Sequence, residues 1–106
     1  MKVLPNELRA VLHIFNADET LRKKTLPLID TETHAIDWYS ISQIPLDAAR
    51  SAAVLWAYTL YGGSIRGTNP FVCAYEMDAR LRRAVVQAIA LRWNIPFDGL
   101  NSLYVA

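Results

Sequence analysis

The hydrophobic and polar positions of this chain repeat with the period of an α-helix over much of its length. Near the N-terminus, the apolar residues at i, i+3, i+4 and i+7 are Leu8, Val11, Leu12 and Phe15. This spacing places their side chains on one face of a helix. Pro5 suits the first turn of that helix, where a missing N–H costs no hydrogen bond. The pattern therefore predicts a first helix over residues 5–16.

Two later segments have the pattern of longer helices. Residues 46–61 begin with several alanines and continue as a nearly unbroken apolar run, which Gly62 and Gly63 end as glycines at helix C-termini do. A helix without a polar face is typical of the centre of a domain. Residues 79–93 follow Asp78, a good capping residue. The inner stripe of this last helix consists of Leu81, Ala84, Val85, Ala88 and Leu91.

Shorter elements are expected between these helices. Residues 18–25 form a polar helix or turn, and residues 26–38 form a small β-hairpin because two apolar runs flank a polar turn. One helical turn, capped by an aspartate, follows at 37–43. An Asn-Pro pair, which suits a helix start, begins a further helix over 69–77. We predict a mainly α fold, a small bundle of about four helices with a short β-hairpin, as a single compact domain over 1–106.

Composition narrows the class of protein but names no activity. The chain has 106 residues, of which 53% are apolar, slightly above the usual ~45–50%, and its formal net charge is +1. Such a chain has enough apolar residues for a core and some to spare for a partner, and it lacks the strong basic excess of many nucleic-acid-binding proteins. Its single cysteine, Cys73, cannot form an internal disulfide. We find no signal peptide and no apolar run of the ~20 residues that a membrane span needs, so we expect a cytoplasmic protein with no membrane partner.

Part of the chain resembles a diverse group of small uncharacterised proteins of bacteria and their phages. The resemblance covers about residues 29–94 and rests on an IDW turn, a helix that ends in Leu-Tyr-x-Gly, the NPF segment and a terminal helix with the pattern Ala-Ile-x-Leu-Arg. Gly62 stands where this group usually has asparagine. The resemblance implies a phage or mobile-element setting. It implies no mechanism.

Few residues have the spacing that catalysis or metal binding requires. His13, His34 and Cys73 are isolated in the sequence, and no HExxH or CxxC motif occurs. We expect His13, on the first helix, to be half-buried and hydrogen-bonded, and His34, in the hairpin turn, to be exposed. The carboxylates of Asp30, Glu32 and Asp37 are explained by turn formation and helix capping. The glycine-rich segment before Asn69 follows a helix and lacks the lysine of a phosphate-binding loop. We therefore expect no cofactor and no metal, and an enzyme whose catalytic residues are scattered in sequence is the third alternative.

The clearest charge feature is a group of arginines at the start of the last helix. Arg80, Arg82 and Arg83 place positive charge where the helix dipole disfavours it. Neighbouring acids, Glu76 and Asp78, could neutralise them. Alternatively, the arginines could bind a phosphate backbone or an acidic partner.

These patterns leave two functional hypotheses from different classes. The first is a small, non-enzymatic protein-interaction module, a phage or mobile-element inhibitor or adaptor that acts by stoichiometric binding to another protein or to a second copy of itself. Its candidate anchors are Trp93, Phe97, Tyr104 and Arg80, because aromatic residues and arginine dominate binding energy at interfaces. The alternative is a nucleic-acid-binding helical domain that uses Arg80, Arg82 and Arg83.

Overall fold

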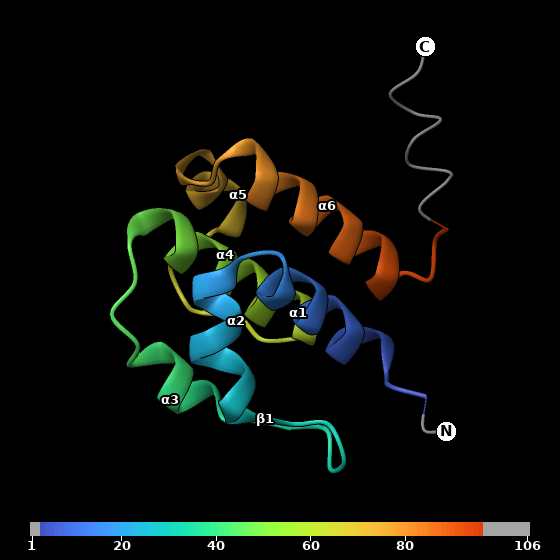
Figure 1. The fold of residues 1–106 in the computed structure, drawn as a ribbon. Helices are drawn as coiled ribbons and strands as arrows, with labels where there is room; N and C mark the ends of the chain where they lie inside the picture. The colour runs from blue at the N-terminus through green and yellow to red at the C-terminus, as the bar shows by residue number, and fades with distance from the viewer. Residues whose placement is uncertain (1–2, 97–106) are drawn as a thin grey trace.

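The computed structural model describes residues 3–96, and within them the chain forms six α-helices, two 3-10 helices and one β-hairpin (Figure 1). In chain order they are α1 (Asn6–Asn16), α2 (Glu19–Thr25), η1 (Leu26–Leu28), β1 (Ile29–Asp30), β2 (Ala35–Ile36), α3 (Trp38–Ser42), α4 (Ala48–Tyr61), α5 (Pro70–Cys73), η2 (Ala74–Glu76) and α6 (Ala79–Arg92). The predicted mainly helical fold with a hairpin is confirmed. The number of helices exceeds four because short helices occupy the connecting segments.

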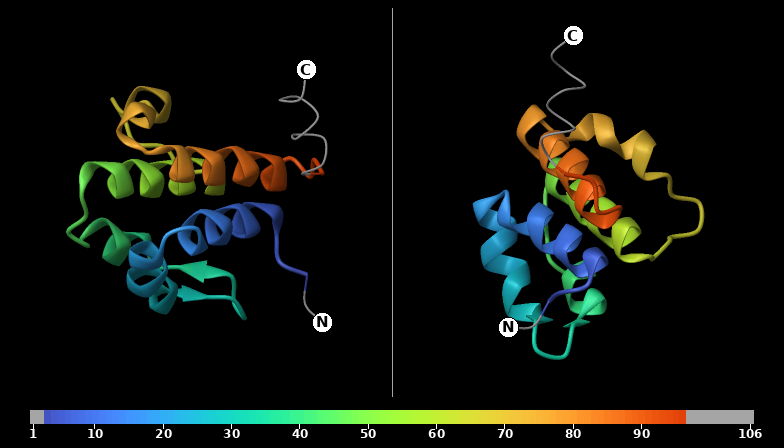
Figure 2. Two further views of the ribbon diagram at one scale, coloured as in Figure 1. Left: turned by 45° about the horizontal axis from the view of Figure 1, so that its top comes forward. Right: turned by 90° about the vertical axis from the view of Figure 1, so that its right-hand side faces the viewer.

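Three long helices, α1, α4 and α6, form the body of the fold. α4 and α6 run in the same direction, and the Arg92 Nε–H donates to the Leu60 carbonyl where both helices end (Figure 2). α1 runs antiparallel to them, because the carbonyl of Ala17, just after α1, accepts from Arg80 at the start of α6. None of the helices described over residues 3–96 is long and apolar enough to cross a membrane.

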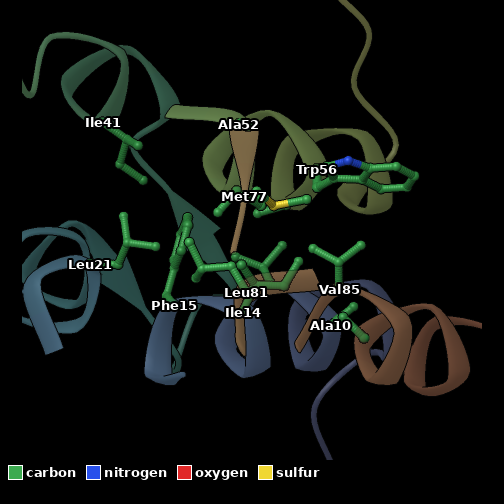
Figure 3. Close-up of a cluster of buried hydrophobic side chains, with 14 residues drawn as sticks. Ala10, Ile14, Phe15, Leu21, Ile41, Ala52, Trp56, Met77, Leu81 and Val85 are labelled. Carbon is green, nitrogen blue, oxygen red and sulfur yellow. The ribbon is translucent and has the colours of Figure 1, made fainter. Parts of the chain in front are cut away.

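The core lies where α1, α4 and α6 meet, with α2, α3 and η2 closing its sides (Figure 3). Phe15 and Ile14 of α1 are completely buried, and Leu81 of α6 and Trp56 of α4 pack into the same cluster. α1 supplies the most central side chains, since it contacts both long helices and α2. The apolar α4, expected at the centre of the domain, contributes Ala52, Ala53, Trp56 and Ala57 to this core, whereas Val54 and Leu55 are only half-buried.

Most helices begin directly after a residue whose side chain caps them. The carboxylates of Asp18, Asp37, Asp47 and Asp78 each accept a hydrogen bond from the backbone N–H three residues later, and Asn69 caps α5 in a similar way. These bonds satisfy amide groups that have no partner inside the helix. At the other end of α4, Gly62 adopts the left-handed conformation, with φ of 111°.

Three predicted elements differ from the structure in extent. Helix α4 begins at Ala48, two residues later than expected, because Asp47 is its cap. The helix expected over 69–77 divides into α5 and the 3-10 helix η2. The hairpin has only two residues in each strand, paired as Ile29 with Ile36 and Asp30 with Ala35, because its first apolar residues form η1.

Candidate interaction surfaces

The arginine at the start of α6 is held by a buried carboxylate. Arg80 Nη2 lies 2.7 Å from Oδ1 of Asp18, whose side chain is 3% exposed, and Arg80 Nη1 donates to the Ala17 carbonyl. Arg50 of α4 approaches the same carboxylate with Nε 2.8 Å from Oδ2. Asp18 thus joins the start of α2 to α4 and α6. This network gives Arg80 a structural role that the sequence did not predict. Asp78, one of the acids expected to neutralise the arginines, also forms an ion pair with Arg80, at 3.8 Å.

The protonation of Asp18 follows from these contacts. Burial by itself raises the pKa of the Asp18 carboxyl, but hydrogen bonds from Arg50, from the Leu21 amide and from Arg80 outweigh it and hold the pKa well below its usual range. The carboxylate is therefore charged at neutral pH. Its negative charge offsets the positive charge of Arg50 and Arg80, which a binding surface would otherwise present.

Arg82 is also turned toward the protein. Its Nε and Nη2 donate to the carbonyls of Ala74 and Tyr75, at 3.1 and 2.9 Å. These carbonyls belong to η2, so Arg82 fastens η2 to α6. Two of the predicted cluster's members, Arg80 and Arg82, therefore also hold parts of the fold together, while all three arginines are exposed.

Arg83 lies beside the junction of α1 and α6, where it lines the same hollow as Arg80. This hollow of about 280 Å³ is also lined by His13 and Asn16 of α1 and by Gln87, one turn further along α6. His13 Nε2 lies 2.8 Å from Gln87 Oε1, which confirms the half-buried, hydrogen-bonded histidine expected from its sequence context. Within residues 3–96, the Arg83 guanidinium has no ion pair with a carboxylate.

The structure describes one of the three predicted aromatic anchors. Trp93, just beyond α6, is 68% exposed, as an anchor for a partner would be. Phe97 and Tyr104 lie outside the described residues. The proposed interaction site therefore has one aromatic member whose position is established.

An apolar hollow that the sequence reasoning missed lies between α3 and α4. We call it the α3–α4 hollow; its volume is about 290 Å³ and its lining consists of Trp38, Tyr39, Ser42, Val54, Leu55, Tyr58 and Ile65. None of these side chains is charged. Tyr39 and Ile65 stand at its rim, 77% and 51% exposed. The helical period of α4 could have indicated this site, because Val54, Leu55 and Tyr58 fall on the side opposite Ala53 and Ala57.

A second exposed apolar patch was also missed, on α5 and η2. Phe71, Val72 and Tyr75 are each more than half exposed, although Phe71 also packs edge-on against the indole ring of Trp56.

The residues with potential chemistry do not come together in the described part of the chain. No group of three or more histidine, cysteine, aspartate or glutamate side chains within residues 3–96 could hold a metal ion. Asp30 accepts from the backbone of Glu32 and Thr33, which confirms its turn role. His34, expected to be exposed, is instead half-buried with φ of 63°, and its carbonyl accepts from the Tyr61 hydroxyl.

Comparison with known proteins gives no family for this chain. No family model matches it, and no curated protein and no solved structure matches it either. A function for this chain therefore has to be inferred from its two surfaces and from the charges beside them.

Proposed function

We propose that this protein is a non-enzymatic protein-interaction module whose docking surface is the α3–α4 hollow. The observation that carries the proposal is an apolar, uncharged hollow with exposed large residues at its rim, Tyr39 and Ile65. Exposed apolar surface of this kind is a feature of protein-binding sites. The phage or mobile-element inhibitor or adaptor role, acting by stoichiometric binding, is part of the same proposal and is supported only by the resemblance of residues 29–94.

The chemistry of the lining favours a partner that offers apolar side chains. The walls are aromatic and aliphatic, and their polar groups are the hydroxyls of Ser42 and the two tyrosines and the buried indole N–H of Trp38. A partner with a charged segment would lose hydration here without gaining an opposite charge. The occupant that fits is the apolar face of an amphipathic helix on another protein, which binds in grooves between helices by side chains spaced three and four residues apart.

The size of the hollow argues against a small-molecule site. Its volume of about 290 Å³ lies just below the ~300–1,000 Å³ that small-molecule pockets occupy, and it is open to solvent on one side. That space holds one or two apolar side chains of a partner. The surrounding exposed residues would then form the rim of a larger interface.

The proposal is tested with two charge substitutions at the rim, Tyr39→Glu and Ile65→Asp. Both residues are exposed, so these changes should leave the free energy of unfolding nearly unchanged. The matched control is Tyr75→Glu, which adds the same charge to the separate patch on η2. Wild-type protein and Tyr75→Glu are expected to retain one protein from nuclease-treated lysate of the source cells at equimolar recovery, and both rim variants should lose it.

Direct binding then decides between the possible outcomes. Titration calorimetry with the purified partner should give one site per chain for wild type and at least tenfold weaker binding for each rim variant. A photo-crosslinking amino acid placed at Tyr39 should attach to an apolar helix of that partner. Equal retention by all variants would reject the α3–α4 hollow as the docking surface. A rim-dependent dimer in sedimentation, with no other protein retained, would replace the proposed partner by a second copy of this chain.

A further inference from the structure

A second surface, chemically unlike the first, follows the line where α1 and α6 meet. We call it the α1–α6 groove. Its first end is the hollow beside His13, Asn16, Arg83 and Gln87. Its other end is a hollow of about 270 Å³ lined by Arg9 of α1 with Asn94, Ile95 and neighbouring residues at the end of α6. Arg83 and Gln87 are one turn apart on α6, so they lie on one face of that helix, and Asn94 follows the helix end beside the second hollow.

The charges in this groove are all of one sign. Among the described residues that line its two hollows there are three arginines and no aspartate or glutamate. Arg80 is held by Asp18, so its charge is offset. Arg9 and Arg83 remain, and within residues 3–96 neither is paired with a carboxylate. Because α1 and α6 are antiparallel, their dipoles offset each other at both ends, and the side chains decide the sign of the field.

We propose that the α1–α6 groove binds the phosphodiester backbone of a nucleic acid without reading its sequence. Arg9 of α1 lies beside the end of α6. Measured along the axis of α6, it is about seven residues beyond Arg83, which is roughly 10 Å at ~1.5 Å per residue. Both side chains are long and flexible, so the two guanidinium groups can contact nearby phosphates of the same strand. The amides of Gln87 and Asn94 lie between or beside them and can donate to phosphate oxygens, as such side chains commonly do.

The lining distinguishes this ligand from other anions. A single small anion would need donors that converge on one point, whereas the arginines are spread along the groove. A single-stranded nucleic acid is usually held by aromatic side chains that stack on its bases. Neither hollow is lined by an aromatic residue other than His13, so contacts to the backbone alone are expected and a duplex is the favoured form.

The experiment measures fluorescence anisotropy of a labelled 20-base-pair DNA duplex with full-length protein across a series of salt concentrations. Two phosphate contacts predict a slope of about −1.8 for the logarithm of affinity against the logarithm of salt, at about −0.9 per contact. Arg83→Ala and Arg9→Ala should each reduce the slope to about −0.9 and weaken binding about tenfold at low salt. Gln87→Glu, which keeps helix propensity and can still accept from His13, should weaken binding by its negative charge alone.

Two arginines outside the groove provide the matched controls. Arg66 lies in the loop after α4, and Arg82 is bonded to η2, so Arg66→Ala and Arg82→Ala should bind the duplex like wild type. Circular dichroism confirms that each variant is folded. Absence of binding in 25 mM salt, or an unchanged affinity in the Arg9→Ala/Arg83→Ala double variant, would overturn the proposal. Preference for a poly-glutamate peptide over duplex DNA and single-stranded RNA would also overturn it, by assigning the groove to an acidic protein.

Discussion

At the scale of single residues, Asp18 connects three helices. Its side chain is nearly inaccessible, yet it caps α2 and receives arginine side chains from α4 and α6. A buried carboxylate is unfavourable unless each oxygen has a donor, and here Oδ1 and Oδ2 both have one. The contacts of Asp18 therefore fix how the start of α2 sits against the two long helices.

Replacing Asp18 with asparagine separates its charge from its capping role. Asparagine caps helices about as well as aspartate, so the α2 start should survive. The loss of the charge leaves Arg50 paired only with Asp47, and Arg80 only with Asp78 at 3.8 Å. Removing one member of a buried pair costs about 3–5 kcal/mol, and we expect the lower end, about 3 kcal/mol, because both arginines can turn toward water. Urea unfolding at pH 7 measures this difference, and a loss below about 1 kcal/mol would show that the network contributes little.

The same residue makes stability dependent on acid pH. The pKa of Asp18 is lower in the folded chain than in the unfolded chain, where aspartate titrates near 3.9. Its stabilising contribution is therefore complete above about pH 4 and declines as pH falls further, since the unfolded state then binds the extra proton. The gap in unfolding free energy between wild type and Asp18→Asn should narrow between pH 4 and pH 2. Asp37→Asn is the useful comparison, because the pKa of Asp37 is also lowered. In Asp37 the cause is hydrogen bonds from Ser40 alone.

At the scale of helices and strands, local signals carried most of the prediction. Helix starts were found because capping is a contact between a side chain and an amide three residues away, which sequence spacing reveals. The division of the segment after Pro70 was not found. There, the hydrogen bonds from Arg82 to the carbonyls of Ala74 and Tyr75 hold η2, and these bonds come from a separate helix. Patterns within a segment contain no record of such a contact.

Alanines set the spacing between the long helices. Ala10, Ala53, Ala57 and Ala88 are all fully buried and belong to α1, α4 and α6. Small side chains at these contacts let the helix backbones approach closely. Ala57→Leu should therefore overpack the core and lower the free energy of unfolding by about 1–3 kcal/mol. Ala48→Leu, at the exposed first position of the same helix, is the control and should change stability by less than about 0.5 kcal/mol. Similar losses in both variants would mean that helix α4, rather than its packing, responds to leucine.

At the scale of the whole molecule, the candidate sites were harder to predict than the fold. The arginine group was visible in sequence, but the contacts of its members were not. Arg80 binds Asp18, which is 62 positions away, and Arg82 binds carbonyls of η2. Arg9 had no place in that group because only the antiparallel packing of α1 on α6 brings it to the same groove. The α3–α4 hollow likewise combines residues of two helices and the loop that contains Ile65. Sites of this kind are properties of packing, and the sequence pattern specifies only their parts.

The same packing predicts an order of local stability that hydrogen exchange can measure. α1 contacts α2, α4 and α6, and five of its residues are buried, so its amides should open only with the whole domain. α5 and η2 have seven residues, few backbone bonds and three exposed large side chains, so they should exchange through local opening at a much lower free energy. In native-state hydrogen exchange at rising urea concentration, the opening free energies of the α1 amides should match that of global unfolding. The α5 amides should already exchange without urea. The free chain leaves α5, η2 and the rim of the α3–α4 hollow exposed. If the amides of α5 were nevertheless as protected from exchange as those of α1, a second chain would have to cover this side of the molecule. A dilution series would then show the protection falling as the protein is diluted.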